Sequence, residues 1–112
     1  MIDQIVFSSS AECIAEGSRL NVVAKFRDSI ARADATPTTV HWTLRDPDDC
    51  REIVPQTSVT PGTSVTLVTS GTNNTTCRRD ERREVTVIVD KGLATQFVAT
   101  YVYQIKNLGA II

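Results

Sequence analysis

The sequence predicts an all-β domain, built as an antiparallel β-sandwich of about seven strands. Apolar and polar residues alternate along most of the chain, and this period of two is the pattern of strands that bury one face. Proline, glycine and aspartate interrupt the alternation at intervals of roughly 8 to 15 residues, as turns between short strands do. Helical periodicity is nearly absent. A small β-barrel is the second architecture that these observations allow.

Three strands are predicted in the first part of the chain. Residues 3–8 form a short strand, and a serine-rich stretch then ends in a turn at Glu16-Gly17-Ser18. Residues 19–27 form the second strand. The alternation lapses over residues 28–37, where we expect an ordered loop rather than a helical turn, and residues 38–44 form the third strand. The side chains expected to face the core are Leu20, Val22, Ala24, Phe26, Val40, Trp42 and Leu44.

Two shorter strands are predicted in the middle of the chain. The sequence Asp46-Pro47-Asp48-Asp49 is a strong turn, because proline presets φ and aspartate side chains accept backbone N–H bonds. Residues 50–54 then form a strand that ends at Pro55. A further turn at Pro61-Gly62 precedes a strand over residues 64–69.

The chain is predicted to finish with a hairpin, in which strands at residues 84–90 and 94–105 are joined across Lys91-Gly92. A chain of 112 residues has the usual size of one domain, so we expect a single domain over residues 1–112. The expected core consists of Leu20, Val22, Phe26, Val40, Trp42, Leu44, Val65, Leu67, Val85, Val87, Val89, Phe97 and Tyr101.

The composition argues against several classes of function. Twelve Lys and Arg against 13 Asp and Glu give a net charge of -1, without the positive field that nucleic-acid binding needs. One His and three Cys leave few side chains for a zinc site or a histidine-based catalytic centre. Apolar runs are far shorter than the roughly 20 residues that span a bilayer. We therefore expect no enzymatic activity, no cofactor or metal, and no nucleic-acid or membrane partner.

Cys13, Cys50 and Cys77 cannot all pair within one chain. The first residues lack the basic and apolar regions of a secretory signal, which predicts synthesis in a reducing cytosol and free thiols. A bridge between Cys13 and Cys50, or between Cys50 and Cys77, is the alternative after release from a cell.

Three polar patterns are candidates for chemistry. The carboxylates of residues 46–49 are of the kind that binds calcium, but they lack the spacing of an EF-hand loop, and we expect a solvated turn. His41 is predicted on the face opposite Trp42, without the G-x-S-x-G signature of a nucleophile. Residues 77–84 hold four arginines and three acids, and either grip an anionic group of a partner or form a mixed-charge loop. The four arginines are Arg78, Arg79, Arg82 and Arg83.

Both ends of the chain are rich in apolar residues, whereas a solitary domain usually ends in polar sequence. Such residues either fold back on their own sandwich or dock on another subunit. At the start of the chain, docking would add a strand to a partner's sheet edge. The candidate partner-binding residues at the two ends are Ile2, Ile5, Phe7, Leu108, Ile111 and Ile112.

Four stretches carry a resemblance to a known family: residues 24–28 (AKFRD), 37–48 (PTTVHWTLRDPD), 85–90 (VTVIVD) and 96–105 (QFVATYVYQI). In these stretches the chain resembles the immunoglobulin-like β-sandwiches of virion proteins in tailed bacteriophages. It departs from antibody-type domains, because no cysteine pair lies on the strands that would carry the inter-sheet disulfide, although Trp42 is placed as their core tryptophan would be.

The resemblance implies an immunoglobulin-like fold and a non-enzymatic structural role in a phage particle, in head decoration or in the head, neck or tail. The implied partners are other virion proteins, such as capsid, portal or tail subunits. The chain would be made in the host cytoplasm and be present in the virion as a homo-oligomer or in many copies. The alternative hypothesis is an adhesion module that binds a host-surface glycan or protein through loops near residues 46–49 and 73–79.

Overall fold

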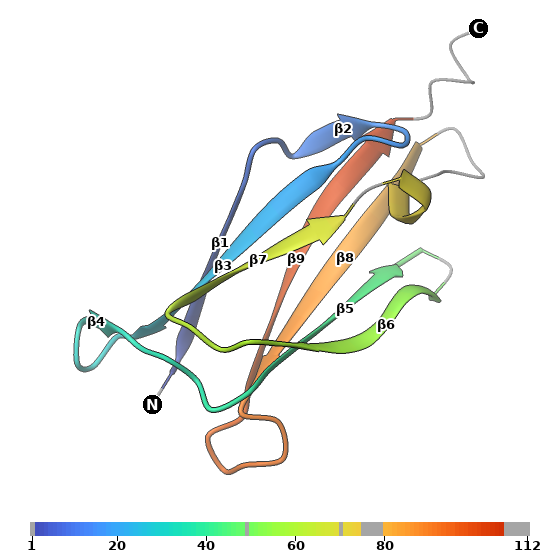
Figure 1. The fold of residues 1–112 in the computed structure, drawn as a ribbon. Helices are drawn as coiled ribbons and strands as arrows, with labels where there is room; N and C mark the ends of the chain where they lie inside the picture. Colours follow the sequence, from blue (N-terminus) through green and yellow to red (C-terminus); the bar gives the residue numbers. More distant parts are fainter. Residues whose placement is uncertain (1, 49, 70, 75–79, 107–112) are drawn as a thin grey trace, which may run out of the picture.

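Two β-sheets enclose the core, as the computed structural model in Figure 1 shows for residues 2–48, 50–69, 71–74 and 80–106. These described residues include nine strands and one short 3-10 helix, η1. The elements are β1 (Gln4–Ser9), β2 (Cys13–Ala15), β3 (Leu20–Asp28), β4 (Ala33–Asp34), β5 (Val40–Asp46), β6 (Arg51–Val59), β7 (Ser64–Thr69), η1 (Gly71–Asn74), β8 (Asp80–Val89) and β9 (Phe97–Lys106).

The strand order is that of an immunoglobulin-like sandwich. In one sheet β3 lies between β1 and β7, and the two-residue strand β4 pairs with the end of β3. The other sheet has the order β2-β9-β8-β5-β6. In immunoglobulin lettering β1, β3 and β7 correspond to A, B and E, and β9, β8, β5 and β6 correspond to G, F, C and C′, with β2 added beside β9. All pairs are antiparallel except β2 with β9, so the predicted all-β sandwich is confirmed, with two short strands added.

The core is built from the predicted alternation. Trp42 on β5 is buried at 8% exposure, and its neighbours in the pattern, Val40 and Leu44, are buried more completely. Phe97 and Tyr101 are only half-buried, and pack against the core from β9. The other predicted core residues are buried, and the structure adds Ile2, Ile14, Tyr103 and Ile105.

Strand β6 runs through Pro55, so the prediction that this strand ends there is wrong. Leu44 on β5 pairs with Val54, whereas Trp42 pairs with Thr57, and the register therefore shifts across a bulge that contains Pro55. The strand forms the edge of its sheet. Proline is tolerated at such a place, because an edge or bulge position does not require its missing N–H for the ladder.

Strand β2 is the main element that the periodicity does not reveal. After Ser9 the chain leaves the first sheet, and Cys13–Ala15 then pairs in parallel with the end of β9. Three residues are too few to display a period of two. The turns at Gly17 and Gly92 are where the sequence predicts them, and both glycines have positive φ, a conformation that glycine adopts without steric cost.

Candidate functional site: a buried ion network at one end of the sandwich

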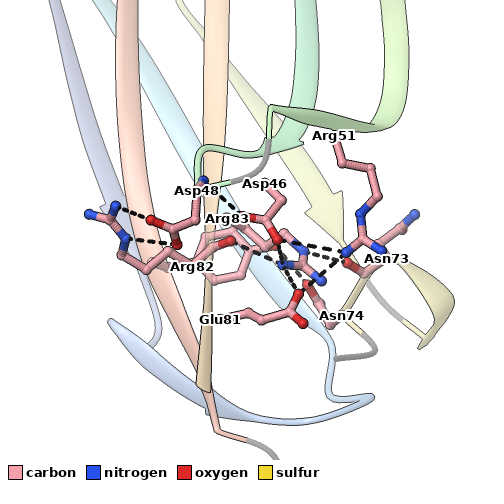
Figure 2. A network of polar contacts seen from close by, with 9 residues as sticks. Asp46, Asp48, Arg51, Asn73, Asn74, Glu81, Arg82 and Arg83 are labelled. Carbon is pink, nitrogen blue, oxygen red and sulfur yellow. Dashed lines mark hydrogen bonds and ion pairs between the residues drawn. The ribbon is translucent and has the colours of Figure 1, made fainter. Parts of the chain in front are cut away.

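Arg83 is the largest fully buried side chain among the described residues. It lies on the inner face of β8, in line with Val85 and the valines that follow. Its Nη1 is 2.8 Å from Oε1 of Glu81 and 3.6 Å from Oδ2 of Asp46 (Figure 2). It also donates from Nε to the carbonyl oxygen of Asn73 at 3.1 Å. The guanidinium is thus held by groups from three parts of the chain.

Arg51 is a second arginine that pairs with both carboxylates of this network. Its Nη2 is 3.3 Å from Oε1 of Glu81 and 3.7 Å from Oδ2 of Asp46, at a side-chain exposure of 42%. Among the described residues of the network, these two arginines therefore face two carboxylates, and both carboxylates and Arg83 are buried. Buried charges persist in proteins when they are paired and hydrogen-bonded in this way.

The prediction of a solvated turn at residues 46–49 is wrong for Asp46, which is buried. It is the last residue of β5 and is fully buried. Its Oδ1 accepts the backbone N–H of Asp48 at 3.0 Å, which is the aspartate turn bond that the sequence predicts. Its Oδ2 forms the ion pairs with Arg83 and Arg51. Calcium binding here is not supported by this arrangement, because Asp46 and Asp48 are both paired with arginine.

A neutral hydrogen-bonded group extends the network towards β9. Asn74, at the end of η1, is fully buried, and its Nδ2 donates to the carbonyl oxygen of Ser18 at 2.8 Å and to Oγ1 of Thr69 at 3.2 Å. The Tyr103 hydroxyl donates to Oδ1 of Asn74 at 2.7 Å. Burial raises the pKa of Tyr103 to about 12, against opposing effects of the Thr69 hydrogen bond and the positive charge of Arg83. Residues 73 and 74, predicted in a polar loop, therefore tie η1 to the sandwich.

The network connects several elements at one end of the sandwich. It joins the β5–β6 turn, η1, β8 and β9 through hydrogen bonds and ion pairs between their residues. Sequence patterning could have placed Arg83 and Glu81 there, because the inward series of β8 continues to them when it is extended before Val85. Asp46 likewise continues the inward series of β5 after Leu44, whereas the amide of Asn74 carries no such local signal.

The four arginines predicted to bind a partner separate in the structure. Arg83 is buried and cannot reach a partner, so that prediction is wrong for this residue. Arg82 has an exposed side chain and forms a bidentate pair with Asp48, with Nη2 to Oδ1 at 2.6 Å and Nε to Oδ2 at 3.3 Å. Arg78 and Arg79 lie outside the described residues.

The apolar residues at the start of the chain pack on their own sandwich. Ile2 is buried at 5% exposure, and Ile5 and Phe7 are half-buried against the core. Phe7 stacks on Tyr101 of β9 with ring centroids 5.7 Å apart. The structure therefore shows these side chains packing on their own sandwich, fully for Ile2 and in part for Ile5 and Phe7; partner binding by the half-buried Ile5 and Phe7 stays a prediction. Leu108, Ile111 and Ile112 lie outside the described residues.

A surface hollow of about 450 Å³ lies beside the ion network, on the side of β9 and β2. A neighbouring hollow of about 470 Å³ shares Cys13, Arg82 and Gln104 with it. Cys13 is free and exposed, as is Cys50, which agrees with the expectation of free thiols; Cys77 is outside the described ranges. The first hollow is lined by Cys13, Asp48, Glu81, Arg82, Gln104, Ile105 and Lys106.

His41 does not belong to either hollow. It lies on β5, where its cross-strand neighbours are Ser58 on β6 and Ile88 on β8. Its Nδ1 is buried, with no hydrogen-bond partner among the described residues.

Comparisons with known proteins add no family. No protein-family model matches the chain, and no curated protein matches it. Within the described ranges, no three His, Cys, Asp or Glu side chains are grouped so that they could hold a metal ion. No helix in the part of the chain that the structure describes has the length and apolar character needed to cross a membrane.

Proposed function

We propose that the chain is a non-enzymatic structural protein of a bacteriophage virion, held by protein-protein contacts in the head decoration or in the head, neck or tail. The resemblance of residues 24–28, 37–48 and the terminal hairpin to virion sandwiches is the starting point. An immunoglobulin-like fold does not fix a function by itself, so the proposal depends on what the surface offers to partners.

The observation that carries the proposal is the open edge of strand β1. This strand pairs with β3 on one side, and in the described chain no strand pairs with its other side. An open edge is a ready template for backbone pairing with another chain. Strand addition is a way to join subunits that requires neither a pocket nor a cofactor, which suits a particle component.

The ion network supports the same proposal. Arg83, Glu81 and Asp46 are committed to one another in the interior and brace one end of the domain. A stable sandwich with an unpaired strand edge can be bound by neighbouring subunits through that edge. Of the charged residues predicted as a binding cluster, Arg83 thus forms buried ion pairs and Arg82 forms a surface ion pair.

The test is the composition of purified particles of the phage that encodes the chain. We expect quantitative mass spectrometry to find the chain in stoichiometric amounts. A copy number in the hundreds would indicate the head surface, and a ring of about 5 to 12 copies would indicate the neck or tail. Absence of the chain from washed, infectious particles would refute the proposal.

The alternative function is a host-adhesion module, and the hollow beside Arg82 favours it. Its lining mixes Asp48, Arg82, Gln104 and Lys106, which offers the donors and acceptors that sugar hydroxyls require. The purified chain would then bind host cells, and Arg82→Ala would weaken this binding. No binding by the wild-type chain at high micromolar concentration would eliminate the alternative.

A further inference from the structure

We infer that two copies of this chain pair edge to edge through β1 (Gln4–Ser9), in antiparallel orientation about a two-fold axis, and so extend the β7-β3-β1 sheet across the dimer. The inference rests on the proposed structural role and deepens it, because it names the first partner as a second copy. Closed two-fold dimers are the commonest way in which identical chains associate.

The backbone of β1 is oriented for this contact. The backbone N–H of Phe26 on β3 donates to the carbonyl oxygen of Thr63 at 2.9 Å, and its carbonyl oxygen accepts from the N–H of Ala35 at 3.1 Å. The peptide groups of Phe26 therefore point away from β1. Ile5 lies directly opposite Phe26 in the register. In an antiparallel ladder, opposed residues point their peptide groups either towards each other or apart. The peptide groups of Ile5, and by alternation those of Phe7 and Ser9, therefore point out of the sheet edge.

Strand β1 also lacks the features that protect edges from pairing. Its six residues contain no proline and no charged side chain, and its register with β3 is regular from Gln4 to Ser9. Natural sheets usually protect an edge with charges, proline or a bulge. Strand β6 of the other sheet has all three, with Arg51, Glu52 and the bulge at Pro55.

The opposite edge of the same sheet, β7, is uncharged as well but has less to gain from a partner. The inward side chains of β7 are already buried, with Val65 at 8%, Leu67 at 1% and Thr69 at 0% exposure. The inward side chains Ile5 and Phe7 of β1 are only half-buried. A second copy placed against β1 would cover apolar surface that its own sandwich leaves accessible, and this covering is favourable.

A two-fold axis at Phe7 satisfies the backbone. It sets Phe7 opposite Phe7 of the second copy and Ile5 opposite Ser9 of the second copy, all residues whose peptide groups point outward. Three such pairs form about six backbone hydrogen bonds. The Phe7 and Tyr101 stack, at 5.7 Å between centroids, would continue into the second copy as a row of four aromatic rings.

The experiment measures the oligomeric state of the purified full chain by sedimentation velocity over a concentration series, with two matched variants. Val6 on β1 and Val68 on β7 are 44% and 39% exposed, on opposite edges of one sheet. We expect the wild-type chain to be a dimer. In Val6→Lys the dissociation constant of the dimer should rise at least about tenfold, because the two new lysines are brought close together. In Val68→Lys the dissociation constant should be unchanged. Thermal unfolding of both variants establishes that each is folded.

Hydrogen exchange of the wild-type chain provides a readout independent of the variants. The amides of Ile5 and Phe7 should become protected as concentration rises, while those of Val6 and Ser8, which face β3, are protected throughout. A monomer at every concentration, a dimer sensitive to Val68→Lys alone, or protection that appears in β7 would each overturn the inference.

The dimer and the proposed function fail in distinguishable ways. A monomeric chain found in stoichiometric amounts in purified particles would overturn the dimer and leave the virion role standing. A β1 dimer formed by a chain absent from particles would leave the dimer standing and remove the virion role.

Discussion

We expect Arg83→Met to lower the free energy of unfolding by about 3–5 kcal/mol, because it leaves buried carboxylates short of their partner. Glu81 and Asp46 have side-chain exposures of 1% and 0%, and Arg83 lies 2.8 Å and 3.6 Å from them. Arg51 would remain, but at 42% exposure it is screened by water. The carbonyl oxygen of Asn73 would also lose its 3.1 Å donor.

The measurement is urea unfolding at neutral pH, followed by tryptophan fluorescence of Trp42. A domain of this size is stable by about 5–15 kcal/mol, so the loss is a large fraction of the total. Each kcal/mol corresponds to about 4 °C in Tm at this chain length, which gives a fall of about 12–20 °C.

Arg82→Met is the matched control, since Arg82 is the next residue on the same strand but has a side-chain exposure of 50%. Its pair with Asp48 lies at the surface, and we expect a loss of about 0–1 kcal/mol. Equal losses in the two variants would refute the network as a stabilising element. The double variant Arg83→Met, Glu81→Met should lose less than the sum of the single variants, because it removes both members of the pair.

Three further predictions concern stability. The raised pKa of Tyr103, about 12 in the folded state and about 10 when unfolded, means that the unfolded chain loses this proton first. Stability should therefore fall by about 2–3 kcal/mol between pH 10 and 12, and Tyr103→Phe should flatten the dependence in urea titrations. Hydrogen bonds from Ser29 lower the pKa of Asp3 below 3.8; the bond from the serine hydroxyl has the larger effect, and the bond from its backbone N–H adds to it. The contribution of these bonds to folding stability is therefore present above pH 3.8 and is lost as the pH falls. Asp3→Asn should show a smaller decline in Tm on acidification, and an unchanged decline would contradict this. Asp90→Ala should cost about 1–3 kcal/mol in urea unfolding, because it removes the 2.7 Å acceptor of the Thr38 N–H; a neutral effect would show that this bond contributes nothing.

Much of the fold was predictable because strand alternation is local. Residues 38–44 illustrate this, since the apolar residues at every second position of that predicted strand are all buried in β5. The failures occurred where local signals conflict with long-range pairing. Pro55 is a local stop signal that an edge bulge accommodates, and β2 exists only because β9 offers it an edge.

The candidate site was less predictable than the fold. Residues 77–84 have a mixed-charge composition that indicates an exposed loop, yet β8 begins at Asp80 and carries Arg83 into the interior. Burial of an arginine depends on the carboxylates that meet it. One of them, Asp46, comes from a different strand, and no pattern within either segment reports that they converge.

The sequence by itself determined that the chain forms strands with one apolar face and turns at glycine, proline and aspartate, because these preferences reside in each residue and its immediate neighbours. Only the tertiary structure decided which edges pair and which remain open, and that Arg83 is interior while Arg82 is at the surface. Burial of a charge and exposure of an edge depend on distant segments, whose mutual placement is a property of the whole fold.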